Sequence, residues 1–300
     1  MILRLLAGLA LAVLCSGTWG ATVVLSLSER APAYEAFVRA FAEHFRDPAH
    51  ALVLRYPDPL TPALPADTRL VIAVGSRAAD ALLTTPLPAD AEILLALVTR
   101  PSYERVARRL PLKGGVLIDQ PAARYIRLVR TTFPDVHGIG LLSGADSQDT
   151  VQALARAARE AGLRVHDAAV RDEDALFPAL QRVVGDASLL LATPDTHVFN
   201  ARTIPAILLS AFRRKIPVVG FSPAYVNAGA VVALYSSPEQ IARQSVALAR
   251  DALAGKPPAG MQYPREFSVG VNGRVARALE LQLDDENILR ERIESQEQPP

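Results

Sequence analysis

Residues 189–244 read LLLATPDTHVFNARTIPAILLSAFRRKIPVVGFSPAYVNAGAVVALYSSPEQIARQ. Short apolar runs alternate in this stretch with a helical segment, and a polar loop follows each apolar run. Runs that are hydrophobic on both faces are typical of parallel strands covered by helices. Such sheets bind ligands beside the loops at the carboxyl ends of their strands. We therefore expect the functional site at the polar loops of this stretch.

The same alternation of strands and helices extends over most of the chain. A glycine pair, Gly114 and Gly115, divides it into two similar series. The first series predicts strands at 22–28, 51–55, 70–74, 93–98 and 116–118, and the second at 138–142, 164–170, 189–192, 217–221 and 230–234. This order predicts an α/β fold with two Rossmann-like lobes, each built on a parallel sheet. Residues 284–300 are rich in charge and are expected to form a frayed tail.

The first twenty residues have the composition of a secretory signal peptide. Arg4 precedes an apolar run at 5–14, and small and polar residues lead to a cleavage site near Gly20 or Ala21. The run is too short to span a bilayer, so the exported chain is expected not to insert into the membrane. A buried first helix is the alternative. Cleavage also removes Cys15, the single cysteine, and with it any disulfide or thiolate metal site.

Charge and motifs argue against several classes of function. Without Arg4, 31 basic residues balance 31 acidic residues, which argues against nucleic acid or an anionic membrane as a partner. The sequence contains no HExxH, GxSxG or GxxxxGK(S/T) motif. Residues 138–144 match a dinucleotide-binding fingerprint only loosely, and His197 beside Asp195 lacks a nucleophile. We expect a protein that is not an enzyme and uses no metal or other cofactor.

Polar residues follow two strands of the first series. Ser76 and Arg77 come directly after the strand at 70–74 and open a helix. The Ser76 hydroxyl and the backbone N–H groups beside it could therefore bind an anionic group of a ligand. An ordinary helix cap explains Ser76 equally well, and a solvated surface position explains Arg77. Thr99 has the same placement after the strand at 93–98.

Polar residues follow the strands of the second series in the same way. They are Ser143, Ser147, Asp195, Thr196, Ser222 and Tyr235. Polar loops after strands are normal in α/β proteins, but their recurrence in both series favours a shared cleft between two lobes. Tyr235 could stack on a ligand or donate its hydroxyl, and a tyrosine at the edge of the core is the alternative.

Ordered pieces of the chain resemble the periplasmic solute-binding components of ABC importers. The resemblance is to the subfamily with a type I periplasmic-binding-protein fold that includes aromatic amino acid binders. The pieces are VIAVGSRAADALL at 71–83, ALVTRPSYERV at 96–106, FPDV at 133–136, IGLL at 139–142, LLLATPDTHVFN at 189–200, KIPVVGFSPAYVNAGAVVALY at 215–235 and SPEQIARQSVALARDALAGKPP at 237–258. Together they cover most of the chain after residue 20 in the same order.

The resemblance implies two lobes that close on a small ligand, with three crossings of the chain between them. The N-terminal lobe would hold residues 21–117 and 236–259, the C-terminal lobe residues 118–235 and 260–283, and the charged tail residues 284–300. Carried over by position, the ligand contacts would come from Ser76, Arg77, Thr99, Ser143, Ser147, Asp195, Thr196, Ser222 and Tyr235.

These observations predict a periplasmic solute-binding protein of an ABC importer, with an inner-membrane permease as its partner. Its ligand is expected to be a small polar molecule, either anionic or amino-acid-like. The alternative is a periplasmic sensory or scaffold protein that uses the same fold to signal to a membrane partner.

Overall fold

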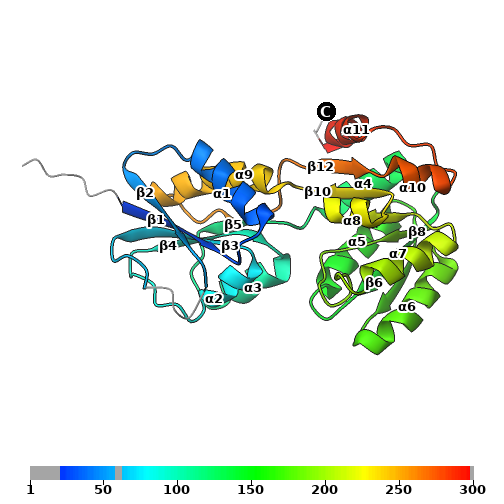
Figure 1. Ribbon diagram of the computed structural model, residues 1–300, viewed down its shortest axis with the longest axis horizontal. Coiled ribbons are helices and arrows are strands. Elements are labelled where there is room, and N and C mark those ends of the chain that lie inside the picture. Colours follow the sequence, from blue (N-terminus) through cyan, green and yellow to red (C-terminus); the bar gives the residue numbers. More distant parts are fainter. Residues whose placement is uncertain (1–20, 58–62, 298–300) are drawn as a thin grey trace, which may run out of the picture.

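The computed structural model describes residues 21–57 and 63–297 and shows two α/β lobes that lie side by side (Figure 1). The signal peptide predicted for residues 1–20 lies outside these residues. The chain passes between the lobes three times, at 118–121, at 236–237 and at 263–267. Within the described ranges, no helix combines the length and the apolar character that crossing a membrane requires.

The first lobe is a six-stranded sheet in the order β11-β5-β4-β3-β1-β2, with every pairing parallel. Helices α1 and α9 cover one face, and α2 and α3 cover the other. The elements are β1 (Ala21–Leu27), α1 (Pro32–His44), β2 (His50–Arg55), β3 (Thr68–Val74), α2 (Ser76–Ala81), β4 (Glu92–Val98), α3 (Arg100–Ala107), β5 (Gly114–Leu117), α9 (Pro238–Leu253) and β11 (Gly260–Gln262).

A spacing of four residues between phenylalanines explains how α1 docks on this sheet. Phe37, Phe41 and Phe45 stack along one side of the helix, with ring centroids 5.9 and 5.2 Å apart. All three side chains are buried in the same core as α9. The helix α9 begins with a capping box in which Ser237 and Gln240 satisfy each other's backbone N–H groups.

The second lobe is a six-stranded sheet in the order β12-β10-β9-β8-β6-β7, in which only β12 runs antiparallel to its neighbour. Helices α4, α5, α10 and α11 pack on one core, and α6, α7 and α8 on the other. The elements are α4 (Ala122–Thr132), β6 (Gly138–Ser143), α5 (Gln148–Glu160), β7 (Arg164–Ala169), α6 (Glu173–Asp186), β8 (Leu189–Leu191), α7 (Ile204–Arg213), β9 (Val218–Gly220), α8 (Pro223–Ala228), β10 (Val232–Tyr235), β12 (Ser268–Val271), α10 (Gly273–Ala278) and α11 (Glu286–Glu297).

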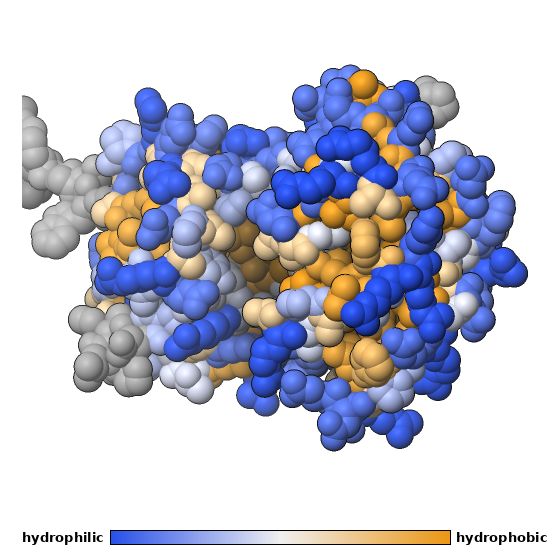
Figure 2. All heavy atoms as spheres, turned by 45° about the vertical axis from the view of Figure 1, so that its right-hand side comes forward, coloured by the Kyte–Doolittle hydropathy of each residue, from blue (hydrophilic) through white to orange (hydrophobic). Residues whose placement is uncertain are grey.

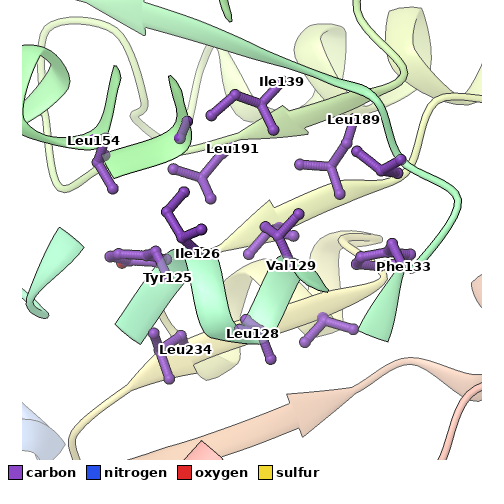
Figure 3. Packing of buried hydrophobic residues seen from close by; sticks show 14 of the residues in the cluster. Tyr125, Ile126, Leu128, Val129, Phe133, Ile139, Leu154, Leu189, Leu191 and Leu234 are labelled. Atoms are coloured by element: carbon purple, nitrogen blue, oxygen red, sulfur yellow. The ribbon is translucent and has the colours of Figure 1, made fainter. Parts of the chain in front are cut away.

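Figure 3 shows how α4 fills the first of these cores. Ile126 and Val129 point from the helix towards Leu191 and Leu189 of β8, and Ile139 of β6 closes the layer. The three residues of β8 are all fully buried, as a strand covered by helices on both faces must be. The predicted α/β fold with two Rossmann-like lobes is therefore confirmed.

The boundary predicted between residues 259 and 260 is wrong. Residues 260–262 form β11, which pairs in parallel with β5 and places Gly260 opposite Gly114. They therefore belong to the first sheet, and the third crossing follows them. The reason is that β5 would otherwise be an edge strand, and β11 satisfies its free backbone groups.

The prediction of a frayed tail from residue 284 is also wrong for the part that the structure describes. Residues 286–297 form α11, and its Leu289 and Ile293 are buried against the core of the second lobe. These two residues are four apart, so they lie on one face of an otherwise charged helix. These two apolar side chains pack α11 on this core beside α4.

Candidate functional site

A pocket of about 170 Å³ lies between the lobes, and a recess between them is visible in Figure 2. The first lobe contributes residues that follow β3 and β4, and the second lobe contributes residues that follow β6 and β8. The lining residues are Ser76, Thr99, Pro101, Ser102, Arg105, Asp146, Pro194, Asp195 and Thr196. The carboxyl ends of the two parallel sheets therefore face the same space, where such sheets bind ligands.

A larger recess of about 920 Å³ lies at the opposite edge of the first sheet. Its walls include the starts of the strands and charged residues that already form ion pairs, such as Arg69 with Asp90 and Lys113 with Glu92. The pocket between the lobes is the better candidate although it is smaller, because ligands of α/β sheets bind at the carboxyl ends of strands.

The sharp turn after β3 presents Ser76 to the pocket. Gly75 has a φ of 91°, and a Cβ added there would lie 2.4 Å from the Ser28 hydroxyl oxygen. Ser28 in turn accepts a hydrogen bond of 2.9 Å from the backbone N–H of Ala78. Only glycine fits this turn, so the close approach of β1 and β3 fixes where α2 begins.

A buried hydroxyl without a partner is the most informative feature of the pocket. Ser102 is 1% exposed, lines the pocket, and its Oγ has no hydrogen-bond partner among the residues described. A buried hydroxyl is normally satisfied, because leaving it unpaired costs on the order of 1–3 kcal/mol. This hydroxyl therefore lacks the partner that a buried polar group normally has, in a residue of the pocket wall.

Three further hydroxyl groups join Ser102 around this space. The side chains of Ser76, Thr99 and Thr196 line the same pocket and make no hydrogen bond within residues 21–57 and 63–297. Thr99 precedes α3 without capping it, so its hydroxyl stays available. The pocket therefore offers four uncommitted donor and acceptor groups, three from the first lobe and one from the second.

The arginine of the pocket is already engaged. Arg105 of α3 donates two hydrogen bonds to Asp80 of α2, at 2.9 and 3.0 Å. The hydrogen bonds to Asp80 raise the pKa of Arg105, and the negative charge of Asp146 from the other lobe adds to the effect. Asp146 also lies 3.7 Å from His197 Nε2. A ligand thus meets an Arg105 whose charge is balanced and an Asp146 that is exposed.

Asp195 ties two loops of the second lobe together. Its Oδ2 accepts hydrogen bonds from the N–H of Gly144 at 2.8 Å and from the hydroxyl of Ser147 at 2.5 Å. Its Oδ1 accepts from the N–H groups of His197 and Val198 at 2.8 and 3.2 Å. Four donors occupy this carboxylate, so it holds the wall of the pocket in place. The ring of His197 faces Asp146, which gives no support to an Asp195–His197 general-base pair.

The first crossing connects directly to the pocket. Asp119 is buried at this crossing and accepts a hydrogen bond of 2.8 Å from the N–H of Arg100, the first residue of α3. Burial raises the pKa of Asp119 to about 6, against the lowering effect of that hydrogen bond. Because Thr99 and Ser102 lie at the start of α3, this hydrogen bond ties the first crossing to the pocket wall.

A hydrogen-bond network links all three crossings. Gln120 donates to the Ser236 hydroxyl at 2.8 Å, and Ser236 donates to the carbonyl of Glu266 at 2.6 Å. Arg124 of α4 donates to the Gln120 side-chain oxygen at 2.7 Å and to the Pro264 carbonyl at 2.9 Å. Side-chain hydrogen bonds therefore join the three crossings to one another.

The other predicted ligand residues do not line this pocket. Arg77 is exposed on α2, and it forms no hydrogen bond or ion pair within the described ranges. Ser143 is buried at the end of β6, and Ser222 precedes α8 without capping it. Tyr235 ends β10 opposite Ser268, where burial and the nearby Glu286 raise its pKa.

The structure thus brings four predicted residues into one pocket and adds residues that were not predicted from sequence patterns. The four are Ser76, Thr99, Asp195 and Thr196, and Ser147 supports them through Asp195. Ser102 could have been found, because it lies three residues after Thr99 and so shares its side of the helix. Arg105 and Asp146 carried no such signal.

The chain matches a family model described as "ABC transporter substrate binding protein" over residues 64–295. No curated protein sequence matches it. Three solved structures resemble it, and because they are only 17–19% identical to it they show the fold alone. A conserved domain protein from Vibrio cholerae is 19% identical, with coverage of 90% of this chain and 98% of its own and a TM-score of 0.64.

The other two structures come from Streptococcus pneumonia and Clostridium difficile. The first, an ABC domain in complex with L-Trp, is 17% identical, with coverage of 89% and 96% and a TM-score of 0.63. The second, a ligand-free, open substrate binding protein with adhesive properties, is 17% identical, with coverage of 88% and 96% and a TM-score of 0.69.

Proposed function

Because the chain belongs to the ABC transporter substrate binding protein family, we propose that it is the periplasmic solute-binding component of an importer and traps a small polar ligand between its lobes. The observation that carries the proposal is the buried, unpartnered hydroxyl of Ser102, a residue that lines a pocket walled by both lobes. A ligand that hydrogen-bonds to Ser102 and to Thr196 would favour the closed state, since it contacts both lobes at once.

The pocket favours an uncharged or ammonium-bearing group over a free anion. Arg77, the expected anion contact, does not line the pocket, and Arg105 is neutralised by Asp80. Asp146 adds an exposed negative charge on the opposite wall. Polyols and the ammonium end of an amino acid suit four hydroxyl groups and one carboxylate. Among the described residues, no aromatic side chain lines this pocket to stack on an aromatic ligand.

Hinge closure is the expected mechanism of capture. The hydrogen-bonded crossings carry the start of α3, and with it Ser102, towards the loop that holds Thr196 and Asp146. Closure would exclude water from the pocket and strengthen the hydrogen bonds to the ligand. The closed, loaded protein would then dock on an inner-membrane permease and release the solute there.

A thermal-shift panel of amino acids, polyols, sugars, carboxylates and nucleosides, followed by calorimetry on each hit, tests the binding role. We expect Ser102→Ala to weaken the best hit about fivefold, as the loss of one hydrogen bond of ~1 kcal/mol implies. Ser222→Ala is the matched control, because the Ser222 hydroxyl lies outside the pocket. The affinity of this variant for the ligand should stay at the wild-type value. A panel in which no solute raises the melting temperature contradicts the proposal.

The importer role needs a separate experiment. Cross-linking of the loaded protein to membranes of its native host should capture a permease of the ABC class. Capture of a sensor ectodomain in its place would show that the ligand is sensed rather than imported, and the ligand-binding role would survive that result.

A further inference from the structure

Helices α6 and α7 present a strip of apolar side chains on the outer surface of the second lobe. Phe177 of α6 is 56% exposed, and Leu209 and Phe212 of α7 are 50% and 43% exposed. The α6–α7 strip consists of Phe177, Pro178, Pro205, Ala206, Leu209 and Phe212, all of which are exposed. Figure 2 shows hydrophobic residues reaching the surface of this lobe.

Contacts at both ends of the two helices make the strip continuous. Arg202, just before α7, lies 3.5 Å from Glu173 in the first turn of α6. At the other end, Arg214 donates a hydrogen bond of 3.0 Å to Gln181 of α6. The helices therefore run side by side in the same direction. Phe177 lies midway between the α6 contacts, so it neighbours the middle of α7.

The fold itself gives no reason for this composition. The inner face of α7 already buries Ile207, Leu208 and Ala211 against the core it shares with α6. A helix that is apolar all round is usually covered on all sides. Exposed apolar patches of a few hundred square ångströms commonly mark an interaction surface.

Unpaired charges of opposite sign, Asp174 and Arg213, stand near the two ends of the strip, whereas Arg202 at the first end already pairs with Glu173. The first turn of α6 carries Glu173 and Asp174, and the last turn of α7 carries Arg213, with Arg182 exposed near the same end. Asp174 and Arg213 form no hydrogen bond or ion pair with any residue that the structure describes. A second copy that lies antiparallel across the strip would place its basic end on the acidic end of the first.

We propose that the protein self-associates through the α6–α7 strip, as a two-fold dimer with antiparallel α7 helices. A two-fold contact uses one self-complementary surface on both copies, which the paired ends provide. The strip supplies an apolar centre of roughly 300 Å², whereas a stable interface buries about 800 Å² per partner. Because the apolar centre is smaller than the area that a stable interface buries, we expect a weak dimer, with a dissociation constant on the order of micromolar.

Sedimentation velocity tests this dimer on the protein that starts at Ala21, which retains every helix and strand described. The weight-average sedimentation coefficient should rise between about 1 and 200 µM, and Leu209→Glu should raise the dissociation constant roughly thirtyfold or more. Leu54→Glu is the control, because Leu54 is 48% exposed on β2 of the other lobe and lies outside the strip.

A charge exchange makes the test specific for the orientation. Arg213→Asp alone should weaken the dimer, and combining it with Asp174→Arg should restore the wild-type dissociation constant. Circular dichroism verifies that each variant is folded. A wild-type protein that stays monomeric over the whole range overturns the proposal, and so does an equal effect of Leu54→Glu and Leu209→Glu. A dimer without rescue by the double exchange overturns the antiparallel arrangement.

Discussion

Replacing Glu297 by glutamine should destabilise the protein more than the loss of a surface charge would. Glu297 ends α11 and binds the buried Arg124 through two hydrogen bonds, Nε to Oε1 at 2.7 Å and Nη2 to Oε2 at 2.8 Å. The Arg124 guanidinium also lies 4.3 Å from the centre of the Phe267 ring. Glutamine preserves the shape of the side chain and removes its charge, so Arg124 stays buried without a counterion.

The expected loss of unfolding free energy is about 3 kcal/mol. Breaking a buried ion pair from one side costs about 3–5 kcal/mol. The lower end applies because the Glu297 side chain is 22% exposed and water can partly solvate the site. Arg127, 3.3 Å from Glu297 Oε1, loses an anion in the same variant. The neighbouring Glu294→Gln should lose at most about 0.5 kcal/mol, because its pair with Arg290 on the same helix is more exposed.

Urea denaturation followed by circular dichroism measures both variants. The double variant Arg124→Met with Glu297→Gln tests the cause, since replacing both charges removes the unpaired cation. It should lose less free energy of unfolding than the two single variants added together. If Glu297→Gln lies within 0.5 kcal/mol of Glu294→Gln, roughly the limit for an exposed pair, the reasoning about the buried pair is refuted.

Two further predictions concern the hinge and the second-lobe wall. Burial raises the pKa of Asp119 to about 6. The folded state therefore keeps a proton on this carboxyl group that the unfolded state releases near pH ~4. The stability that the group contributes consequently falls as the pH rises from about 4 to above 6. Asp119→Asn should remove this decline. Urea denaturation of the wild type and of the variant at several pH values between about 4 and above 6 measures it. If the free energy of unfolding depends on pH in the same way in both proteins, the prediction is contradicted. A Cβ at Gly144 would lie 2.6 Å from the Asp195 carboxylate, so Gly144→Ala should cost about 1–3 kcal/mol and weaken ligand binding. Gly185→Ala on α6, where a Cβ meets nothing within 4 Å, is its control and should be neutral or stabilising in the same denaturation assay.

The periodicity of apolar residues predicted most elements of the fold, because each element is formed by consecutive residues. The strands expected at 93–98 and 138–142 are β4 and β6 within one residue. The second lobe's short strand β8 is three leucines, and its burial follows from its composition. Patterns of this kind need no knowledge of distant residues.

Part of the pocket was also predicted from patterns in consecutive residues. Ser76, Thr99, Asp195 and Thr196 lie in loops that directly follow strands, so the rule for carboxyl ends of parallel strands finds them. The same rule also selected Ser222 and Tyr235, which follow strands on other parts of the second sheet. Which loops face the other lobe depends on the order of strands in the sheet, and sequence periodicity does not contain that order.

The sequence by itself determined the alternation of strands and helices, the two similar series, and the positions of the polar loops, because all three depend on neighbours along the chain. Only the tertiary structure decided the partners of the charged and buried groups. The Arg105–Asp80 pair spans 25 residues, the link between Ser147 and Asp195 spans 48, and the link between Arg124 and Glu297 spans 173. Long-range contacts of this kind follow from how elements pack, which also made the expected tail a docked helix and placed β11 in the first sheet.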